Sequence, residues 1–454
     1  GVPLYNVNHM LGFFSVFNSD ALKNVTLYKG SFPARFGGRL SSVVDVHMKD
    51  GDDKKIRGSL GIGLISSKLQ LEGPILKERT PFDVSLRRTY FDLLLQPIVR
   101  ANAGNEGISS AGYYFYDVNA KVTHKLSHRD KLYLSMYMGD DAIYLKSANE
   151  STVYAGNNTP GGMASVVTVK EHRKVNWNWG NAITALRWNR ILNNKLFVNT
   201  TASFTRYRSS LGNSQGEGEN DSGLTYRSGI RDWTLKTDFE YMPAAMHDIK
   251  FGAAYTYHAF SPDVTSMKFR GGEVIEQPVD TVIGSPRVYA HETAAYLEDD
   301  FSVSRLWKIN LGLHLSSFHV QNKNYFSLQP RISTRLLLTD DLSVKAGYAY
   351  MNQYIHMLSS SMVSFPTDLW VPTTKNILPM RSHQYAAGVF YSLRNIADFS
   401  VEGYYKTMDN LLEYKEGASF MGVSANWEEK VSVGRGVAYG IELLAQRSFG
   451  NTTG

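Results

Sequence analysis

The chain of 454 residues contains no cysteine, so a disulfide framework, a thiolate nucleophile and a cysteine-type zinc site are all excluded. Long hydrophobic runs are also missing. The longest, such as Leu93 to Leu95 and Leu336 to Leu338, fall far short of the roughly 20 residues that a membrane-spanning helix needs. With 43% hydrophobic and 20% charged residues, the chain is too apolar for a disordered protein and too charged for a helical membrane bundle. If it crosses a membrane, it crosses as strands.

Aromatic residues and glycine, in contrast, are abundant, with 27 Tyr, 22 Phe and 38 Gly. Tyr and Phe favour strands, and Gly favours turns and bulges, so the composition indicates an all-β protein. The formal charge of +6 is scattered along the chain rather than clustered with stacking aromatics. We therefore expect no nucleic-acid partner; weak attraction to an anionic lipid surface, or plain surface charge, explains the positive balance.

From about residue 57 onward, segments of some ten residues alternate apolar with polar or small side chains, as strands with two different faces do. In the segment 307–316, one face carries Trp307, Ile309, Leu311, Leu313 and Leu315, and the other carries Lys308, Asn310, Gly312, His314 and Ser316. The same separation occurs in 249–258 and in 342–351. The apolar face fits either the core of a soluble sandwich or the lipid-facing side of a transmembrane barrel.

The connections distinguish these two folds. Short turns are predicted near 128–131, 192–195, 243–248, 304–306, 339–341 and 393–395. Longer polar stretches are predicted at 96–112, 147–176, 209–231, 261–287, 355–382 and 410–434, with a short one at 321–324. Alternation of short and long connections places all short turns at one end of an up-and-down barrel, which is the outer-membrane arrangement. The sequence thus predicts a large antiparallel transmembrane β-barrel of about sixteen strands.

Residues 1–50 do not follow this pattern. They contain two short strand-like segments around a Gly- and Pro-rich connection, and residues 51–56 read as a charged linker before a barrel at 57–454. A bore as wide as about sixteen strands make would leak unless something filled it. The N-terminal segment is therefore expected to be a plug.

Three sequence stretches carry a family resemblance. They are Ala21-Leu-Lys-Asn-Val-Thr-Leu-Tyr-Lys-Gly30, Phe32-Pro-Ala-Arg-Phe-Gly-Gly38 and Leu40-Ser-Ser-Val-Val-Asp-Val46. Together they resemble the C-terminal end of the plug of TonB-dependent outer-membrane transporters. The segments 329–333, 341–348 and 378–388 resemble barrel segments of that family, most closely those of Bacteroidetes.

The resemblance implies a 22-stranded family barrel, so we expect the chain to be a fragment that covers the end of the plug and a barrel truncated at its C-terminus. The TonB box and the start of the plug would precede Gly1. It also implies a location in the outer membrane of a Gram-negative bacterium. The implied partners are the TonB–ExbB–ExbD energy-coupling complex, outer-membrane lipid and lipopolysaccharide, a surface-exposed lipoprotein, and a small-molecule, peptide or glycan substrate.

Four residues are candidates for substrate binding. Asn6, Asn8 and His9 precede an apolar segment that, by its position in the family, would face the substrate, and amides with an aromatic surface suit a polar organic ligand. For Asn8 and His9, packing inside the plug is an equally good interpretation. Trp370, in the middle of a predicted loop, is the best aromatic candidate.

Arg87, Arg88, Arg331 and Arg335 lie inside predicted strands, where exposure to lipid would be costly, so they should point into the barrel. Buried charges need partners, and we expect these arginines to contact plug carboxylates such as Asp45. A substrate path is the alternative role.

The sequence has no nucleophile elbow, no metal-spaced histidine cluster and no phosphate-binding glycine loop, so no catalytic residue, metal site or cofactor is predicted. The function expected from sequence and resemblance is TonB-dependent import of a scarce nutrient by substrate binding and plug gating. An adhesin or protein-docking barrel without import is the first alternative, and an outer-membrane barrel hydrolase is the second.

Overall fold

The computed structural model describes residues 1–30, 32–155, 165–217, 220–269, 279–359, 369–393, 396–416, 418 and 426–447. The barrel strands are β5 (Arg57–Ile62), β6 (Ser66–Leu76), β7 (Thr80–Thr89), β8 (Ile108–Lys125), β9 (Asp130–Ala155), β10 (Ser165–Asn193), β11 (Leu196–Glu217), β12 (Asn220–Ala244), β13 (His247–Phe269), β14 (Val279–Gly284), β15 (Val288–Ser302), β16 (Trp307–Val320), β17 (Lys323–Leu337), β18 (Leu342–Gln353), β21 (Met380–Leu393), β22 (Ala397–Tyr414) and β23 (Val431–Gln446).

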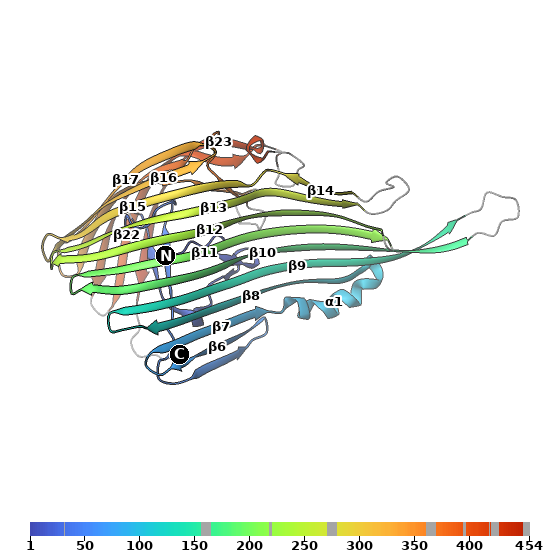
Figure 1. Cartoon of the computed structure of the whole chain (residues 1–454), viewed down its shortest axis with the longest axis horizontal. Helices are drawn as coiled ribbons and strands as arrows, with labels where there is room; N and C mark the ends of the chain where they lie inside the picture. The colour runs from blue at the N-terminus through green and yellow to red at the C-terminus, as the bar shows by residue number, and fades with distance from the viewer. Residues whose placement is uncertain are drawn as a thin grey trace.

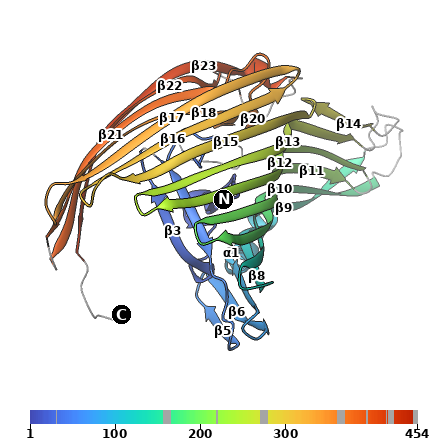
Figure 2. The ribbon, with the colours of Figure 1, turned by 60° about the vertical axis from the view of Figure 1, so that its left-hand side comes forward.

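The remaining elements are β1 (Asn8–His9), β2 (Phe14–Ser15), β3 (Leu22–Tyr28), β4 (Val43–Met48), β19 (Ile355–Leu358), β20 (Leu369–Pro372), the helix α1 (Phe91–Glu106) and the 3-10 helices η1 (Met10–Gly12), η2 (Ser19–Ala21) and η3 (Trp427–Lys430). In the described residues, seventeen strands form one antiparallel sheet curved into a barrel (Figures 1 and 2). The predicted fold is therefore confirmed. The expected sixteen or so strands correspond to these seventeen, of which β14 is a short strand paired with the C-terminal part of β13.

The connections have the predicted asymmetry. Tight turns join β8 to β9, β10 to β11, β12 to β13, β15 to β16 and β17 to β18 at one end of the barrel, here called the short-turn end (Figure 1). The helix α1 and the β19–β20 hairpin lie in connections at the opposite end, here called the long-loop end.

Two of the predicted long connections are mostly strand. β9 and β10 pair as far as Ala155 and Ser165, and β11 and β12 pair as far as Glu217 and Asn220, so the stretches at 147–176 and 209–231 form extended hairpins. Figure 1 shows β9 and β10 reaching well beyond the neighbouring strands. Where a hairpin extends beyond the bilayer, both of its faces meet water, so its side chains need not alternate between apolar and polar. Strands of this kind are therefore not recognised by their alternation.

The predicted loop at 96–112 is also different, because its first part belongs to α1. Pro97, a usual helix breaker, lies inside this helix. The helix packs on β8, and the amide of Gln96 donates a hydrogen bond to Ser110 Oγ at 2.9 Å. No helix in the described part of the chain has the length and hydrophobicity required to cross a membrane.

The two faces of the strands have opposite chemistry. On β8, Asp117, Asn119, Lys121 and Thr123 are all buried on the inner face, whereas the residues between them are partly exposed on the outer face. On β15, Leu297 is 55% exposed and its neighbour Glu298 is fully buried. A polar interior under an apolar exterior is the arrangement of a barrel that meets lipid.

The N-terminal segment, residues 1–50, lies inside the barrel wall (Figure 2). β3 and β4 form their own two-stranded antiparallel sheet. At the end of β4, the Met48 carbonyl accepts a hydrogen bond of 3.1 Å from Nζ of the inward-facing Lys121. The core of the molecule is therefore the contact between this segment and the inner face of the barrel.

The lipid-facing assignment predicts how the barrel responds to a charge at different depths. Leu297→Arg, in the middle of β15, should lower the free energy of unfolding by about 2–4 kcal/mol, because the guanidinium would lie at the depth of the acyl chains. Phe326→Arg is the matched control: Phe326 is 72% exposed near the β16–β17 turn at the long-loop end, where the cost should be about 0–1 kcal/mol. Urea unfolding in phospholipid vesicles measures both; equal costs would contradict the assignment.

Candidate functional site: the interface between the N-terminal segment and the barrel

His9 occupies the centre of this interface. Its Nε2 lies 2.6 Å from Asp117 Oδ1 and its Nδ1 lies 2.6 Å from Asp141 Oδ2. Asp117 on β8 is directly opposite Gly139 on β9, so Asp141 is its diagonal neighbour on the same inner face. Diagonal positions are about 7–8 Å apart, a gap that an imidazole can bridge. The register of two barrel strands thus forms the binding site for one side chain of the N-terminal segment.

The geometry defines the protonation of His9. Carboxylates only accept hydrogen bonds, so both ring nitrogens must donate, which requires the imidazolium form. Burial lowers the pKa of His9, but the hydrogen bonds and charges of Asp117 and Asp141 outweigh this effect and raise the pKa to about 9. The ring also stacks on Phe115 with centroids 4.2 Å apart. His9 therefore serves as a cation held between two acids.

Further donors surround the two carboxylates. Arg87 Nε donates to Asp117 at 2.7 Å, and Arg87 Nη2 donates to the Ser15 carbonyl of the N-terminal segment at 2.7 Å. Tyr137 donates to Asp117 at 3.0 Å. The Met10 backbone N–H donates to Asp141 at 3.0 Å. Each buried charge is thus matched, as a low-dielectric interior requires.

A second network lies around Tyr5. The hydroxyl of Tyr5 donates to Asp232 on β12, which also accepts a hydrogen bond from His258 Nδ1 at 2.7 Å. The other nitrogen, Nε2 of His258, is 3.3 Å from Glu292 on β15. This Asp–His–Glu arrangement resembles the Asp–His–Asp arrangement at His9 in chemistry, but here the histidine is on the barrel wall.

The β19–β20 hairpin covers this second network from the long-loop end. Trp370 on β20 packs edge-on against Tyr5, with ring centroids 5.0 Å apart and planes at 69°. The guanidinium of Arg39 lies over both rings, 5.7 Å from the Tyr5 centroid and 5.8 Å from that of Trp370. The loop aromatic predicted to bind substrate is thus in contact with the N-terminal segment.

The glycine-rich connection of the N-terminal segment fits closely against β16. A Cβ on Gly37 would lie 2.2 Å from His314 Nε2, and a Cβ on Gly312 would lie 2.7 Å from the methyl of Ala34. Nδ1 of His314 donates to the Ala34 carbonyl at 2.9 Å. These contacts leave no room for a side chain at either position, which gives a physical reason for Gly37, and Gly38 has a φ of +72°, which favours glycine.

Arg331 anchors the same connection. Its Nη1 donates to the carbonyls of Phe32, Pro33 and Phe36, at 3.3, 2.7 and 2.5 Å. Its guanidinium also lies 4.5 Å from the Phe32 ring centroid. Nearby, Arg35 Nη1 forms an ion pair of 2.7 Å with the buried Glu298 of β15.

The other predicted residues have different positions. Asn6 exchanges hydrogen bonds with Asn181 on β10: the Asn6 N–H donates at 3.2 Å, and the Asn181 amide donates back to the Asn6 carbonyl at 2.8 Å. Asn8 is partly buried and its carbonyl accepts from the Asn6 side chain at 3.0 Å. His9 is 1% exposed. None of these contacts tests substrate binding, and the enclosed position of His9 agrees with the alternative interpretation, packing inside the plug.

The expected pairing of barrel arginines with plug carboxylates needs correction. Arg331 contacts backbone carbonyls of the segment instead of acids, and Arg87 contacts a carbonyl of the segment together with a barrel acid. Arg88 forms an ion pair of 2.9 Å with Asp92, which follows it by four residues in the sequence. Asp45 forms its ion pair with His47 at 3.3 Å, inside the N-terminal segment. Backbone carbonyls can serve as partners of these arginines in place of carboxylates, because a guanidinium donates strong hydrogen bonds to any oxygen.

Sequence reasoning missed the acids Asp117, Asp141 and Asp232. One signal could have found them: each interrupts a strand pattern at an inner-face position, where an unpaired carboxylate would be costly. Among the described residues, no group of three or more potential ligands is arranged to hold a metal ion. The site consequently offers binding and docking chemistry.

Comparison with known proteins adds the family. A family model described as TonB dependent receptor-like, beta-barrel matches residues 92–454. The chain belongs to this family. Its members are outer-membrane proteins of Gram-negative bacteria and are not enzymes, so the predicted location and the absence of an enzymatic role are confirmed. The short-turn end is then the periplasmic end. The N-terminal segment lies inside the barrel, where a plug was expected, and is called the plug below.

Solved structures agree on the fold. FpvA of Pseudomonas aeruginosa, bound to heterologous pyoverdines, matches with a TM-score of 0.59 and 12% identity, over 94% of this chain and 58% of its own. The ferric-catecholate import receptor Fiu from Escherichia coli K12 matches with a TM-score of 0.60 and 12% identity, over 96% and 68%. The copper transporter OprC matches with a TM-score of 0.63 and 11% identity, over 96% and 66%. No curated protein sequence matches. The chain therefore spans about 58–68% of the length of these three structures.

The contacts of His9 with Asp117 and Asp141, here called the His9 clamp, predict that docking of the plug depends on pH. Because the pKa of His9 is raised from 6.5 to about 9, its stabilisation is fully present below pH 6.5 and is lost as the pH rises through about 9. The full effect is on the order of 3 kcal/mol. Thermal unfolding and limited proteolysis of the purified receptor at pH 6, 7.5 and 10 measure it. His9→Gln should remove this part of the pH dependence; a variant with the wild-type pH profile would refute the clamp.

The Arg331 anchor predicts a looser plug when it is removed. Arg331→Gln leaves carbonyls of the plug without their donor, at roughly 1–3 kcal/mol for each one that stays buried. In planar bilayers the variant should show frequent open-channel events. Arg335→Gln, four residues along the same strand, makes no plug contact of this kind in the described part of the chain and serves as the control. Silent traces from the Arg331 variant would show that the anchor is dispensable.

Proposed function

We propose that the protein imports a scarce nutrient across the outer membrane, by substrate binding at the plug and extracellular loops followed by TonB-driven movement of the plug. One observation carries this proposal: the plug is held by hydrogen bonds and ion pairs at His9, Tyr5, Arg35 and Arg331 that can break and re-form. Such an interface closes the bore firmly at rest, and mechanical work can open it without unfolding the wall.

The partners follow from the family. We propose coupling to the TonB–ExbB–ExbD complex on the periplasmic side, contact of the exposed apolar wall with outer-membrane lipid and lipopolysaccharide, and docking of a surface lipoprotein on the extracellular loops. A Bacteroidetes origin, indicated by motif resemblance, stays a prediction.

The substrate is a small molecule, peptide or glycan. The titles of the structural neighbours name pyoverdines, ferric catecholates and copper, but at 11–12% identity they share only a fold with this chain. We propose that Trp370, Asn6 and Asn8 meet the substrate. Since Trp370 covers Tyr5, binding there would require the β19–β20 hairpin to move, and would then disturb the network of Tyr5 and Asp232. His9 would sense this change without touching the substrate.

Plug movement can be tested because the 454 residues contain no cysteine. Val16 of the plug is fully buried, whereas Phe13 is 80% exposed. In the native host growing on its ordinary medium, Val16→Cys should react with a membrane-permeant maleimide several-fold faster when TonB is present than when it is deleted. Phe13→Cys should react equally in both strains. Equal labelling of Val16→Cys with and without TonB would contradict energised gating and favour a docking barrel.

A further inference from the structure

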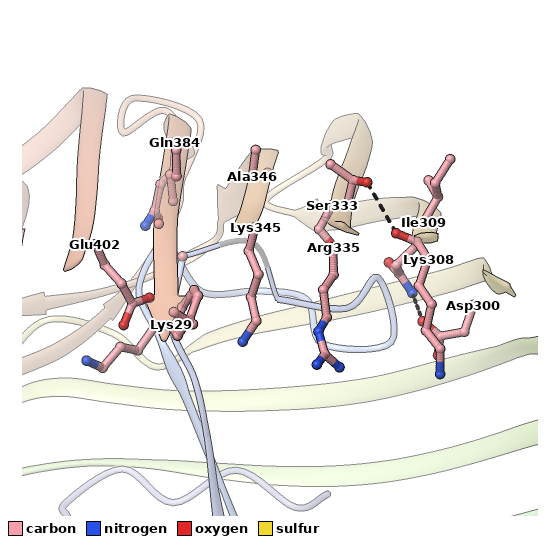
Figure 3. A pocket seen from close by; sticks show the side chains of 18 of the residues that line it. Lys29, Asp300, Lys308, Ile309, Ser333, Arg335, Lys345, Ala346, Gln384 and Glu402 are labelled. Carbon is pink, nitrogen blue, oxygen red and sulfur yellow. Dashed lines mark hydrogen bonds between the residues drawn. The ribbon is translucent and has the colours of Figure 1, made fainter. Parts of the chain in front are cut away.

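A large cavity lies between the plug and the wall near the periplasmic end. Its volume is about 1280 Å³. The plug contributes residues from the end of β3 and from the connection that precedes β4. The wall contributes residues of β12, β13, β15, β16, β17, β18, β21, β22 and β23 and of the β10–β11 turn. Figure 3 shows polar side chains of these strands around it. The contacts of His9, Tyr5 and Arg331 lie outside its lining.

Three cations line this cavity in a row. Lys308 on β16 is directly opposite Arg335 on β17, and Arg335 is directly opposite Lys345 on β18. Directly opposed side chains have Cβ atoms about 4.5–5.5 Å apart, and like charges at this spacing destabilise a sheet. Figure 3 shows the three side chains extending from neighbouring strands in the same direction. The wall thus concentrates three positive charges on one small area.

Of the four acids in the cavity lining, three form ion pairs with other lysines. Glu442 pairs with Lys29 at 2.5 Å. Asp248 and Asp300 pair with Lys250 at 2.7 and 3.2 Å. Glu402 is separated from Lys345 by Gly388, which lies opposite both residues, and Figure 3 places it beside Lys29.

Within the described residues, none of the three cations of the row forms an ion pair. Lys345 Nζ lies over the ring of Phe390, 3.9 Å from its centroid. The other two basic residues of the wall that face the cavity, Lys195 and Lys406, donate to the carbonyls of Pro243 and Leu40. Asp300 on β15 is the diagonal neighbour of Lys308, but it is already paired with Lys250, so the positive charge of the row is compensated only in part.

We propose that Lys308, Arg335 and Lys345 form a binding site for a small multivalent anion, one that carries several carboxylate or phosphate oxygens. The planar guanidinium in the middle suits bidentate contact with such a group, and a lysine on each side adds a point charge. All three side chains are exposed to solvent, which screens their charges in part. A concave surface lined by charges of one sign nevertheless raises the local concentration of oppositely charged ions. The anion offsets the repulsion that the strand register imposes.

The location gives the site a role in import, which rests on the function proposed above. An anionic substrate released past the plug would meet this row before it reached the periplasm, so the row would favour anionic cargo and its exit. The binding itself needs no TonB, and a failure of plug movement would leave it unchanged.

The test uses the purified full-length receptor in neutral detergent at low salt, with citrate and inorganic pyrophosphate as probes. Each probe should raise the unfolding temperature of the wild type, because a ligand that binds only the folded state stabilises it. Arg335→Gln should unfold at a higher temperature than the wild type without the probe, because it removes the central repulsion. It should bind both probes at least tenfold more weakly in isothermal titration calorimetry.

Arg305→Gln is the control, because Arg305 is an exposed residue of the β15–β16 turn outside the cavity lining. It should bind the probes like the wild type. If Arg335→Gln does not fold, Lys345→Gln replaces it with the same expectation. The proposal fails if neither probe binds the wild type, if Arg335→Gln binds them equally well, or if Arg305→Gln loses binding to the same degree.

Discussion

The structure depends on the rule that a charge removed from water must meet a partner. A barrel that presents apolar side chains to lipid has to turn its polar ones inward, and here the plug meets them. His9 between Asp117 and Asp141 is the clearest case, because two acids held close by strand register would repel each other without the cation between them. The plug therefore supplies part of the charge balance of the wall, and the two form one electrostatic unit.

The same strand serves both environments at adjacent positions. On β15, Leu297 faces outward while Glu298, fully buried, holds Arg35 of the plug. A shift of one residue in register would place the acid in lipid and the leucine against an arginine. The alternation thus fixes the register strongly, and this rigidity allows the contacts to the plug to be placed accurately enough to hold single side chains such as Tyr5 and His9.

The fold could be predicted because its signals are local. Alternation within ten residues gave the strands, and the spacing of turns gave the topology. The extended hairpins at 147–176 and 209–231 were not predicted because water on both faces removes the alternation. The helix α1 was not predicted either; it contains Pro97, a residue that disfavours a helix interior. The site was less predictable. The sequence predicts that Arg331 points into the barrel, because a guanidinium exposed to lipid would be costly. Its partners, backbone carbonyls near Phe36, lie about three hundred residues away in sequence. No spacing rule reaches that far.

The interface is uneven along the barrel axis. Toward the long-loop end, Asp232, His258 and Glu292 satisfy one another and the β19–β20 hairpin adds cover. Toward the periplasmic end, a cavity separates plug from wall, and Lys308, Arg335 and Lys345 lie in register without forming an ion pair in the described residues. Repulsion in a wall reduces stability, so a stable resting barrel gains nothing from it. In the proposed import mechanism this unevenness would give plug movement a direction, because the hydrogen-bonded contacts face the long-loop end and the cavity lies between plug and wall at the other end.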